Sequence, residues 1–169
     1  LDKDSFHHPQ VFGEIESSLR HSVFQVLAIV TTTGFVTADY TSWNSFLTVF
    51  FFGLMFLGGS AGSTSGGIKV VRHLLMIKSG VLEFKRALHP NAIIQPRYNG
   101  KVVSQEIIGN ILGFFILYML SFIIGSLVFG LMGLDFESAI GVAASSLGNV
   151  GPAIGDFGPA SNFSQLPAI

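Results

Sequence analysis

The sequence predicts an all-α membrane protein, in which helix-pore loop-helix repeats combine re-entrant pore helices with a full transmembrane helix and a broken one. Three observations support this fold class. Hydrophobic residues make up 49% of the chain and charged residues only 11%, where a soluble domain carries about 25% charged residues. One uncharged run is long enough to cross a bilayer. Two shorter apolar segments end at equivalent glycines, and such turns at membrane depth are typical of re-entrant loops.

The first short apolar segment lies within residues 22–46, after a polar stretch of 20 residues. Residues 139–163 repeat it when Gly34 is placed on Gly151. Helices of about 11 to 12 residues reach only about half of a bilayer roughly 30 Å thick. Each copy is therefore predicted to be a re-entrant pore helix that ends at its glycine. Because backbone outside a helix at membrane depth must be buried or line a water-filled path, the pair indicates a conduction pathway.

A broken transmembrane helix is predicted between residues 46 and 77. Apolar residues 46–57 form one half and residues 68–77 the other, and neither half spans a bilayer alone. Between them, residues 58–67 contain five glycines, each of which costs a helix about 1 kcal/mol relative to alanine. This composition favours a functional break, and the alternative is a kink that only allows close helix packing.

The later part of the chain contains one long apolar run, residues 107–134, which carries no charge. This run is predicted to form a full transmembrane helix. It follows a basic connector, residues 78–104, in which Asn99 and Gly100 predict a turn. The second pore helix comes next. Because the chain stops where the repeat predicts another spanning helix, we expect it to be part of a longer polypeptide.

The charges orient these elements. Seven of the nine Lys and Arg residues lie in the central loop or the helix end before it, so this loop is predicted to be cytoplasmic. Both pore loops would then enter from the outer face, where eight of the ten acidic residues lie: Asp2, Asp4, Glu14, Glu16, Asp39, Asp135, Glu137 and Asp156. As a group these acids favour a cation path, although each alone could be a solvated loop residue. We expect Lys69 and Arg72 to extend to the inner interface, with an electrostatic barrier beneath residues 58–67 as the alternative role. Tyr40 and Trp43 are expected to anchor the outer interface.

The two glycine turns carry the candidate ion-binding chemistry. A dehydrated alkali cation needs several oxygens in place of its water, and the backbone carbonyls of a pore loop can supply them. Glycine suits such a turn because it tolerates positive φ. The alternative is an ordinary helix C-cap followed by a turn. The candidate oxygens belong to Thr32, Thr33, Gly34 and Phe35 in one copy and to Asn149, Val150, Gly151 and Pro152 in the other.

Other chemistry is not favoured by the sequence. There is no cysteine for a disulfide or a thiolate metal site. The five histidines show no ligand spacing beyond the adjacent pair His7 and His8. Residues 62–69 lack the Gly-Lys-Ser/Thr of a phosphate-binding loop, and residues 107–134 lack the paired acids or histidines of a membrane-embedded enzyme. We expect no enzymatic activity, no covalently bound cofactor and no nucleic-acid partner.

Several motifs occur in a characteristic order over essentially the whole chain: Thr31 to Phe35 (TTTGF), Ala38 to Tyr40 with Trp43, Gly58 to Lys69 (GGSAGSTSGGIK), His89-Pro90, and Asn149 to Pro152 (NVGP). Together they resemble the TrkH/KtrB family of potassium transporters, which is related to the plant and fungal HKT and Trk proteins. In that family one polypeptide holds four helix-pore-helix repeats around a single pore like that of the potassium channels. The resemblance implies that residues 1–79 end the third repeat, residues 80–104 are a cytoplasmic connector, and residues 105–169 are the fourth repeat without its last helix.

The resemblance implies potassium uptake across the cell inner membrane, with potassium ion as the substrate. The glycine turns would be two quarters of a selectivity filter, and the gate beneath it would consist of Gly58, Gly59, Gly62, Ser63, Thr64, Gly66 and Gly67. Implied partners are membrane lipid, a second copy in a homodimer, and a cytoplasmic nucleotide-binding regulatory subunit of the TrkA/KtrA type. The chain departs from the family at Ala153, where the family commonly has glycine. The alternatives are a secondary transporter with alternating access and a sodium-permeable relative.

Overall fold

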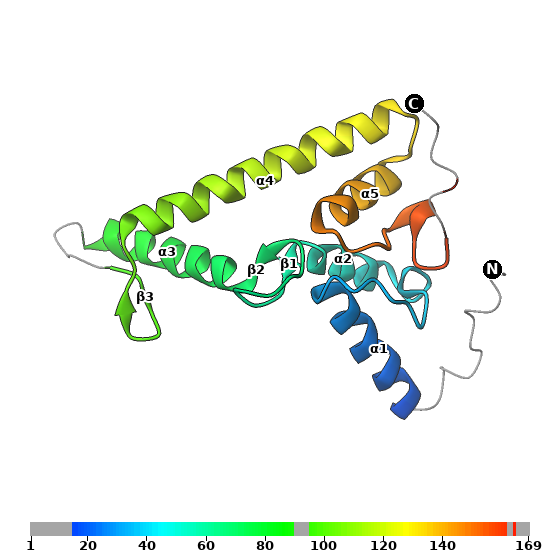
Figure 1. The fold of residues 1–169 in the computed structure, drawn as a ribbon, viewed down its shortest axis with the longest axis horizontal. Coiled ribbons are helices and arrows are strands. Elements are labelled where there is room, and N and C mark those ends of the chain that lie inside the picture. Colours follow the sequence, from blue (N-terminus) through cyan, green and yellow to red (C-terminus); the bar gives the residue numbers. More distant parts are fainter. Residues whose placement is uncertain (1–14, 90–94, 162–163, 165–169) are drawn as a thin grey trace.

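The computed structural model describes residues 15–89, 95–161 and 164, and within them it is mostly helical (Figure 1). The all-α class is therefore confirmed. Five residues noted in the sequence analysis lie outside the described residues: His7, His8, Asp2, Asp4 and Glu14. The α-helices are α1 (Ile15–Val30), α2 (Ser45–Leu54), α3 (Val70–Leu88), α4 (Gln105–Leu131) and α5 (Phe136–Gly148). The short elements are the 3-10 helices η2 (Tyr40–Ser42) and η3 (Gly155–Phe157) and the strands β1 (Leu57–Gly58), β2 (Ile68–Lys69), β3 (Arg97–Tyr98) and β4 (Lys101–Val102).

Helix α4 runs along one edge of the molecule (Figure 1). Its first half packs on α3 through Leu75, Ile108 and Ile111, which are all buried. Its second half lies beside α5, where a Cβ added to Gly125 would stand 3.7 Å from the Cβ of Ala143. Helix α1 projects on the other side of α2, so α2, the first half of the broken helix, lies between α1 and α5 (Figure 1).

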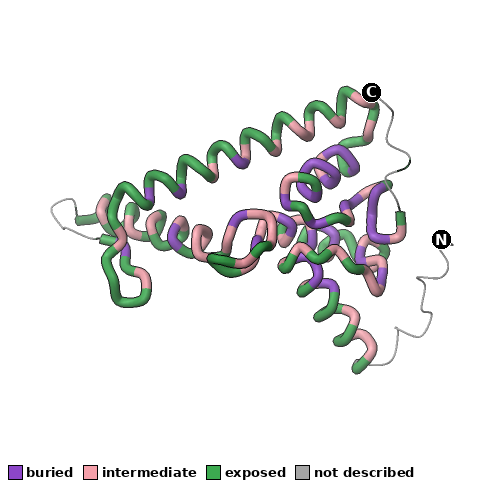
Figure 2. The backbone as a smooth tube through the Cα atoms, in the orientation of Figure 1, coloured by how far each residue is buried: buried purple, intermediate pink, exposed green. Residues whose placement is uncertain are grey.

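The predicted transmembrane helix is α4, which is long and apolar enough to cross a membrane. The side chain of Ser104 caps its start by accepting the N–H of Ile107 (3.4 Å). It ends just before Gly133, whose φ of +93° cannot continue a helix. Most of its surface is exposed (Figure 2), as expected for a helix that lies against lipid or against other membrane helices.

Helix α1 is longer than the predicted pore helix. It has 16 residues and already includes residues 15–20, which the sequence pattern assigned to the polar lead-in. Glu16 and Arg20 form an ion pair one helical turn apart, and such pairs favour the extra turn. At 1.5 Å per residue α1 is about 24 Å long and α5 about 20 Å, so both are still shorter than a bilayer of roughly 30 Å.

Asp135 fixes the start of α5. Its carboxylate oxygen Oδ2 accepts the backbone N–H of Glu137 (3.1 Å) and of Ser138 (3.3 Å). The pKa of Asp135 is lowered, chiefly by a hydrogen bond from the Ser138 side chain and then by these backbone N–H groups. The carboxylate form is therefore the better cap, since it accepts both N–H groups at the positive end of the helix.

We expect Asp135→Ala to lower the stability of the full-length protein by about 1 kcal/mol at pH 7, because two N–H groups lose their acceptor. The folded pKa lies below the unfolded one, so the charge-dependent contribution is complete above the unfolded pKa of about 4 and is lost as pH falls through the folded pKa. The difference in thermal unfolding between wild type and Asp135→Ala should therefore narrow in acid. Asp135→Asn, which keeps an acceptor, is the control; a pH-independent gap between wild type and Asp135→Ala would contradict this account.

The predicted broken helix consists of α2 and α3. Residues 55–69 leave the helix, and β1 pairs with β2 in parallel, with Leu57 opposite Ile68 and Gly58 opposite Lys69. The loop is thus closed at its base by its own backbone hydrogen bonds. The second half is longer than predicted, because α3 continues to Leu88 through the start of the connector. The connector ends in the β3-β4 hairpin, whose predicted turn is present at Asn99 and Gly100, both with positive φ.

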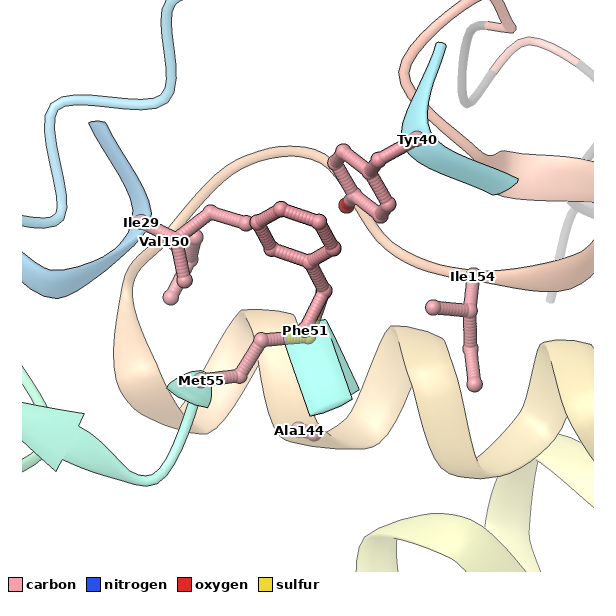
Figure 3. Close-up of a cluster of buried hydrophobic side chains, with 7 residues drawn as sticks. All are labelled: Ile29, Tyr40, Phe51, Met55, Ala144, Val150 and Ile154. Carbon is pink, nitrogen blue, oxygen red and sulfur yellow. The ribbon is translucent and has the colours of Figure 1, made fainter. Parts of the chain in front are cut away.

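The main core joins the two copies of the repeat (Figure 3). Phe51 of α2 lies at its centre, with its ring 4.6 Å from that of Tyr40 between centroids. The cluster draws on α1, η2 and α2 from the first copy and on α5 and the turn after it from the second: Ile29, Tyr40, Phe51, Met55, Ala144, Val150 and Ile154. Burial of this many large apolar side chains fixes the two glycine turns relative to each other.

Candidate functional site

The two glycine turns have the same backbone form. Thr32 and Asn149, at equivalent positions, both have a φ of +54°, and Gly34 and Gly151 follow with φ of +72° and +110°. The hydrogen bonds repeat as well. The N–H of Thr33 donates to the carbonyl of Ala28, and the N–H of Val150 donates to that of Ser145, both at 2.9 Å. The sequence repeat is therefore a structural repeat, and each pore helix ends in a left-handed residue.

The turns also lie against each other. A Cβ added to Gly34 would stand 2.3 Å from the carbonyl oxygen of Val150, well inside contact distance. A Cβ on Gly151 would stand 3.7 Å from the Cα of Gly34. Glycine is thus required at position 34 both by its positive φ and by the neighbouring backbone.

The carbonyl groups of the two turns differ in their partners. Within the described part of the chain, the carbonyls of Thr32, Thr33, Gly34 and Phe35 accept no hydrogen bond. In the second turn, the carbonyl of Gly151 accepts the hydroxyl of Ser145 at 2.9 Å. In the first turn these four carbonyl oxygens therefore have no hydrogen-bond donor among the described residues, whereas in the second turn the oxygen of Gly151 is already engaged.

Ser145 was not singled out from the sequence, although it braces the second turn. It is 2% exposed. Its hydroxyl also accepts the N–H of Gly151 at 3.1 Å, so one side chain holds both polar groups of that glycine. The only signal in the sequence is a hydroxyl within an apolar helix. The first copy has Ala28 at the equivalent position.

Gln25 braces the first turn in a different way. Its side chain is 1% exposed, and its Nε2 donates to the carbonyl of Ala38 at 2.8 Å. His21 adds a contact from its Nδ1 to the hydroxyl of Thr37, at 3.1 Å. A buried amide is kept only where it is hydrogen-bonded, so Gln25 links the pore helix to the chain that leaves the turn.

Tyr40 ties the first copy to the second. It is fully buried, and its hydroxyl donates to the carbonyl of Ala153 at 3.0 Å. The expectation that Tyr40 anchors the outer interface is wrong, because the ring is buried in the core beside Phe51.

The departure from the family at Ala153 is accommodated by the backbone. Ala153 has a negative φ and a fully buried side chain, and its N–H donates to the carbonyl of Phe157 at 3.0 Å. Alanine at this position therefore fits the backbone.

We expect Tyr40→Phe to destabilise the full-length protein by about 1–3 kcal/mol, since the carbonyl of Ala153 would be left buried without its donor. Thermal unfolding of the purified protein measures the effect. Trp43→Phe is a suitable control, because Trp43 packs on the same Phe51 ring and is only half-buried. Equal stability of Tyr40→Phe and wild type would show that this bond between the copies is not made.

The glycine-rich loop contacts both turns through Gly66. The N–H of Gly66 donates to the hydroxyl Oγ1 of Thr32 at 3.1 Å. A Cβ on Gly66 would stand 2.0 Å from the carbonyl oxygen of Gly148, and one on Gly58 would stand 2.4 Å from that of Gly66. Among the predicted gate residues, Gly58 and Gly66 therefore lie against the turns or the loop base. Gly62 and Thr64 lie at its exposed tip.

Lys69 is turned into this loop. Its Nζ donates to the carbonyls of Ser63 (2.9 Å) and Ser65, and lies 3.3 Å from both hydroxyls. The expectation that it extends to the inner interface is therefore wrong. Its neighbour Arg72 instead lies over the ring of Phe114, with the guanidinium carbon 4.0 Å from the ring centroid.

The described acidic residues make local contacts. Asp39 caps η2 by accepting the N–H and the hydroxyl of Thr41, and Glu16 pairs with Arg20. Over residues 15–89, 95–161 and 164, no group of three His, Asp or Glu side chains could hold a metal ion.

Comparison with known proteins identifies what this arrangement is similar to. A family model named TrkH and described as "Cation transport protein" matches residues 4–169. The chain is 37% identical over 164 residues to the Trk system potassium uptake protein TrkH of Salmonella typhimurium, covering 97% of this chain and 33% of that protein. It is 34% identical over 156 residues to TrkG of Escherichia coli K12, covering 92% and 32%.

The fold is similar to a solved structure as well. The crystal structure of the potassium transporter TrkH from Vibrio parahaemolyticus superimposes with a TM-score of 0.82 and 34% identity, covering 96% of this chain and 34% of that one. The chain therefore spans about a third of the length of the relatives it matches.

Proposed function

Because the chain belongs to the TrkH family of cation transport proteins, we propose that it forms two quarters of a potassium-selective pore and the gate beneath them. The observation that carries the proposal is the pair of equivalent turns, with matching positive φ at Thr32 and Asn149 and at Gly34 and Gly151. Its relatives are named as potassium uptake proteins, and potassium ion is accordingly the proposed substrate.

Selection of the ion follows from the unpaired oxygens. A potassium ion that enters the pore loses water and gains carbonyl oxygens from Thr32, Thr33, Gly34 and Phe35, and from Asn149 and Val150 of the adjoining turn. The protein supplies rigidity, since Gln25, Ser145 and Tyr40 hold the turns from behind. No covalent step is needed.

The glycine-rich loop acts as the gate. It lies against both turns at Gly66, and its base is closed by the β1-β2 pair. Displacement of the loop from the turns breaks the bond from Gly66 to Thr32, and the freed backbone groups can bond to water in the pore.

The oligomeric state and the partner subunit are proposed from membership of the TrkH family. The full-length protein would be a homodimer in the cell inner membrane, with both pore loops entering from the outer face and with α4 against lipid or other membrane helices. A cytoplasmic nucleotide-binding subunit of the TrkA/KtrA type would contact the connector. In support, the exposed end of α3 combines apolar Phe84 and Leu88 with basic Lys85 and Arg86, a composition suited to a regulatory partner.

Rubidium uptake tests the function. The full-length protein is expressed in cells that lack their own potassium uptake systems, and rubidium entry is measured in competition with potassium or sodium. We expect entry to exceed that of vector-only cells and to be inhibited by potassium but not by equal sodium. Inhibition by both ions would favour the sodium-permeable relative. Flux in vesicles that requires a second ion gradient would favour alternating access.

A further inference from the structure

The glycine-rich loop encloses the ammonium group of Lys69. Four oxygens from two serines surround it: the carbonyls of Ser63 and Ser65 and the hydroxyls of the same residues. Lys69 itself is at the foot of the loop, paired with Gly58 in the parallel strands. The side chain therefore reaches back across the loop rather than away from it.

The hydroxyl groups of the loop are arranged to accept a cation. The hydroxyl of Ser63 donates to the carbonyl of Ser60 (2.8 Å), so the contact between the two serine hydroxyls (2.8 Å) uses the proton of Ser65. The hydroxyl of Ser65 also accepts the N–H of Gly59 at 2.8 Å. Each hydroxyl has then donated its one proton, and the remaining lone pair of each faces Lys69.

The charge of Lys69 is matched by these oxygens and not by an acid. Among the described acids, Glu16 pairs with Arg20 and Glu83 with Arg86, and neither contacts Lys69. A monovalent cation held by carbonyl and hydroxyl oxygens is the same chemistry by which a pore binds potassium. The ammonium group of Lys69 thus occupies a site of the kind that binds a monovalent cation, and it is covalently attached to the chain.

We propose that Lys69 is a positioning residue for the gate: its ammonium group acts as a tethered cation that holds the loop in the form that rests on Thr32 and Gly148. The inference rests on the proposed function, in which this loop is the gate. Removal of the ammonium group leaves the loop oxygens without a donor, and the loop then opens more often. Its positive charge beneath the turns also opposes the entry of a second cation while the loop is closed.

Hydrogen exchange in the loop tests the proposal directly. The N–H of Gly66 donates to Thr32 while the loop rests on the turns, so its rate of deuterium labelling in the full-length protein, followed on a loop peptide by mass spectrometry, reports loop opening. We expect Lys69→Met to raise this rate about tenfold, equivalent to ~1.4 kcal/mol. Arg72→Met is the matched control, because it removes a charge from the start of α3, just after Lys69, without touching the loop. Ser65→Ala, which keeps every charge, should act in the same direction as Lys69→Met.

Equal labelling of Lys69→Met and its parent would overturn the proposal, as would an equal rise in Arg72→Met. If Lys69→Met does not fold, Ser65→Ala decides by the same measurement. These results do not depend on transport. If the wild type shows no rubidium flux but Lys69→Met still speeds labelling, the proposed function fails and the role of Lys69 in holding the loop stands.

Flux with chemical rescue provides the second readout. In proteoliposomes, Lys69→Cys should raise basal rubidium flux several-fold while keeping the preference for potassium over sodium. Treatment with 2-bromoethylamine converts the cysteine into a close analogue of lysine, and flux should return toward the wild-type value once mass spectrometry verifies the modification. A verified modification that leaves flux raised would contradict the tethered-cation role, because a merely structural defect is not reversed by restoring one ammonium group.

Discussion

Gly34→Ser is expected to abolish selective rubidium uptake by the full-length protein. A side chain at position 34 would meet the carbonyl oxygen of Val150 at 2.3 Å, and the φ of +72° is strained for any other residue. The left-handed backbone costs about 1–2 kcal/mol and overpacking about 1–3 kcal/mol. Because each 1.4 kcal/mol is about tenfold in an equilibrium, the native turn would be depopulated by more than tenfold.

The measurement is uptake in cells without potassium uptake systems, with rubidium competing against sodium. Gly53→Ala is the control, since a Cβ at this helical glycine of α2 meets no atom within 4 Å. We expect it to transport like the wild type. Unchanged potassium preference in Gly34→Ser would mean that this turn is structural, and the alternating-access mechanism would then be preferred.

Gly66→Ala is expected to raise rubidium flux, whereas Gly34→Ser abolishes selective uptake. The added Cβ would stand 2.0 Å from the carbonyl oxygen of Gly148, so the loop must move away from the turns and lose its bond to Thr32. Overpacking against backbone costs about 1–3 kcal/mol or more. We expect basal rubidium flux to rise, with potassium preference retained, and Tm to fall by several degrees.

Gly62→Ala separates steric overlap from backbone strain. Gly62 is in the same loop and also has a positive φ (+116°), but a Cβ there meets nothing within 4 Å. It should cost only the strain of about 1–2 kcal/mol and leave flux nearly unchanged. A result in which Gly62→Ala and Gly66→Ala behave alike would show that the contact with Gly148 does not control the loop.

The elements that the sequence predicts well are those with local signals. A long uncharged run marks α4, a glycine cluster marks the break between α2 and α3, and the repeated glycines mark the turns at Gly34 and Gly151. Each of these features depends on composition over a few neighbouring residues. The assignments of filter and gate to particular residues remain predictions, because they concern ions and motions.

The side chains that hold the site could not be predicted from such signals. Tyr40 bonds to a carbonyl 113 residues away, and Gln25 to one 13 residues away, so each role exists only after packing. From the sequence, a charged side chain at a helix end is expected to extend to the membrane interface. The sequence pattern does not show that Ser63 and Ser65 fold next to Lys69 and offer four oxygens to its ammonium group.

The unequal bracing of the two turns has a consequence for how such a pore can be tuned. Ser145 holds the amide and the carbonyl of Gly151, whereas the first copy has Ala28 at that place and carries its brace at Gln25. In a pore of four identical subunits, one substitution changes all sides together. In the proposed single-chain pore each side is encoded separately, so a substitution at Ser145 alters one side alone. The ion preference of such a pore can then change by a substitution in one repeat at a time, and the four sides of the filter need not be identical.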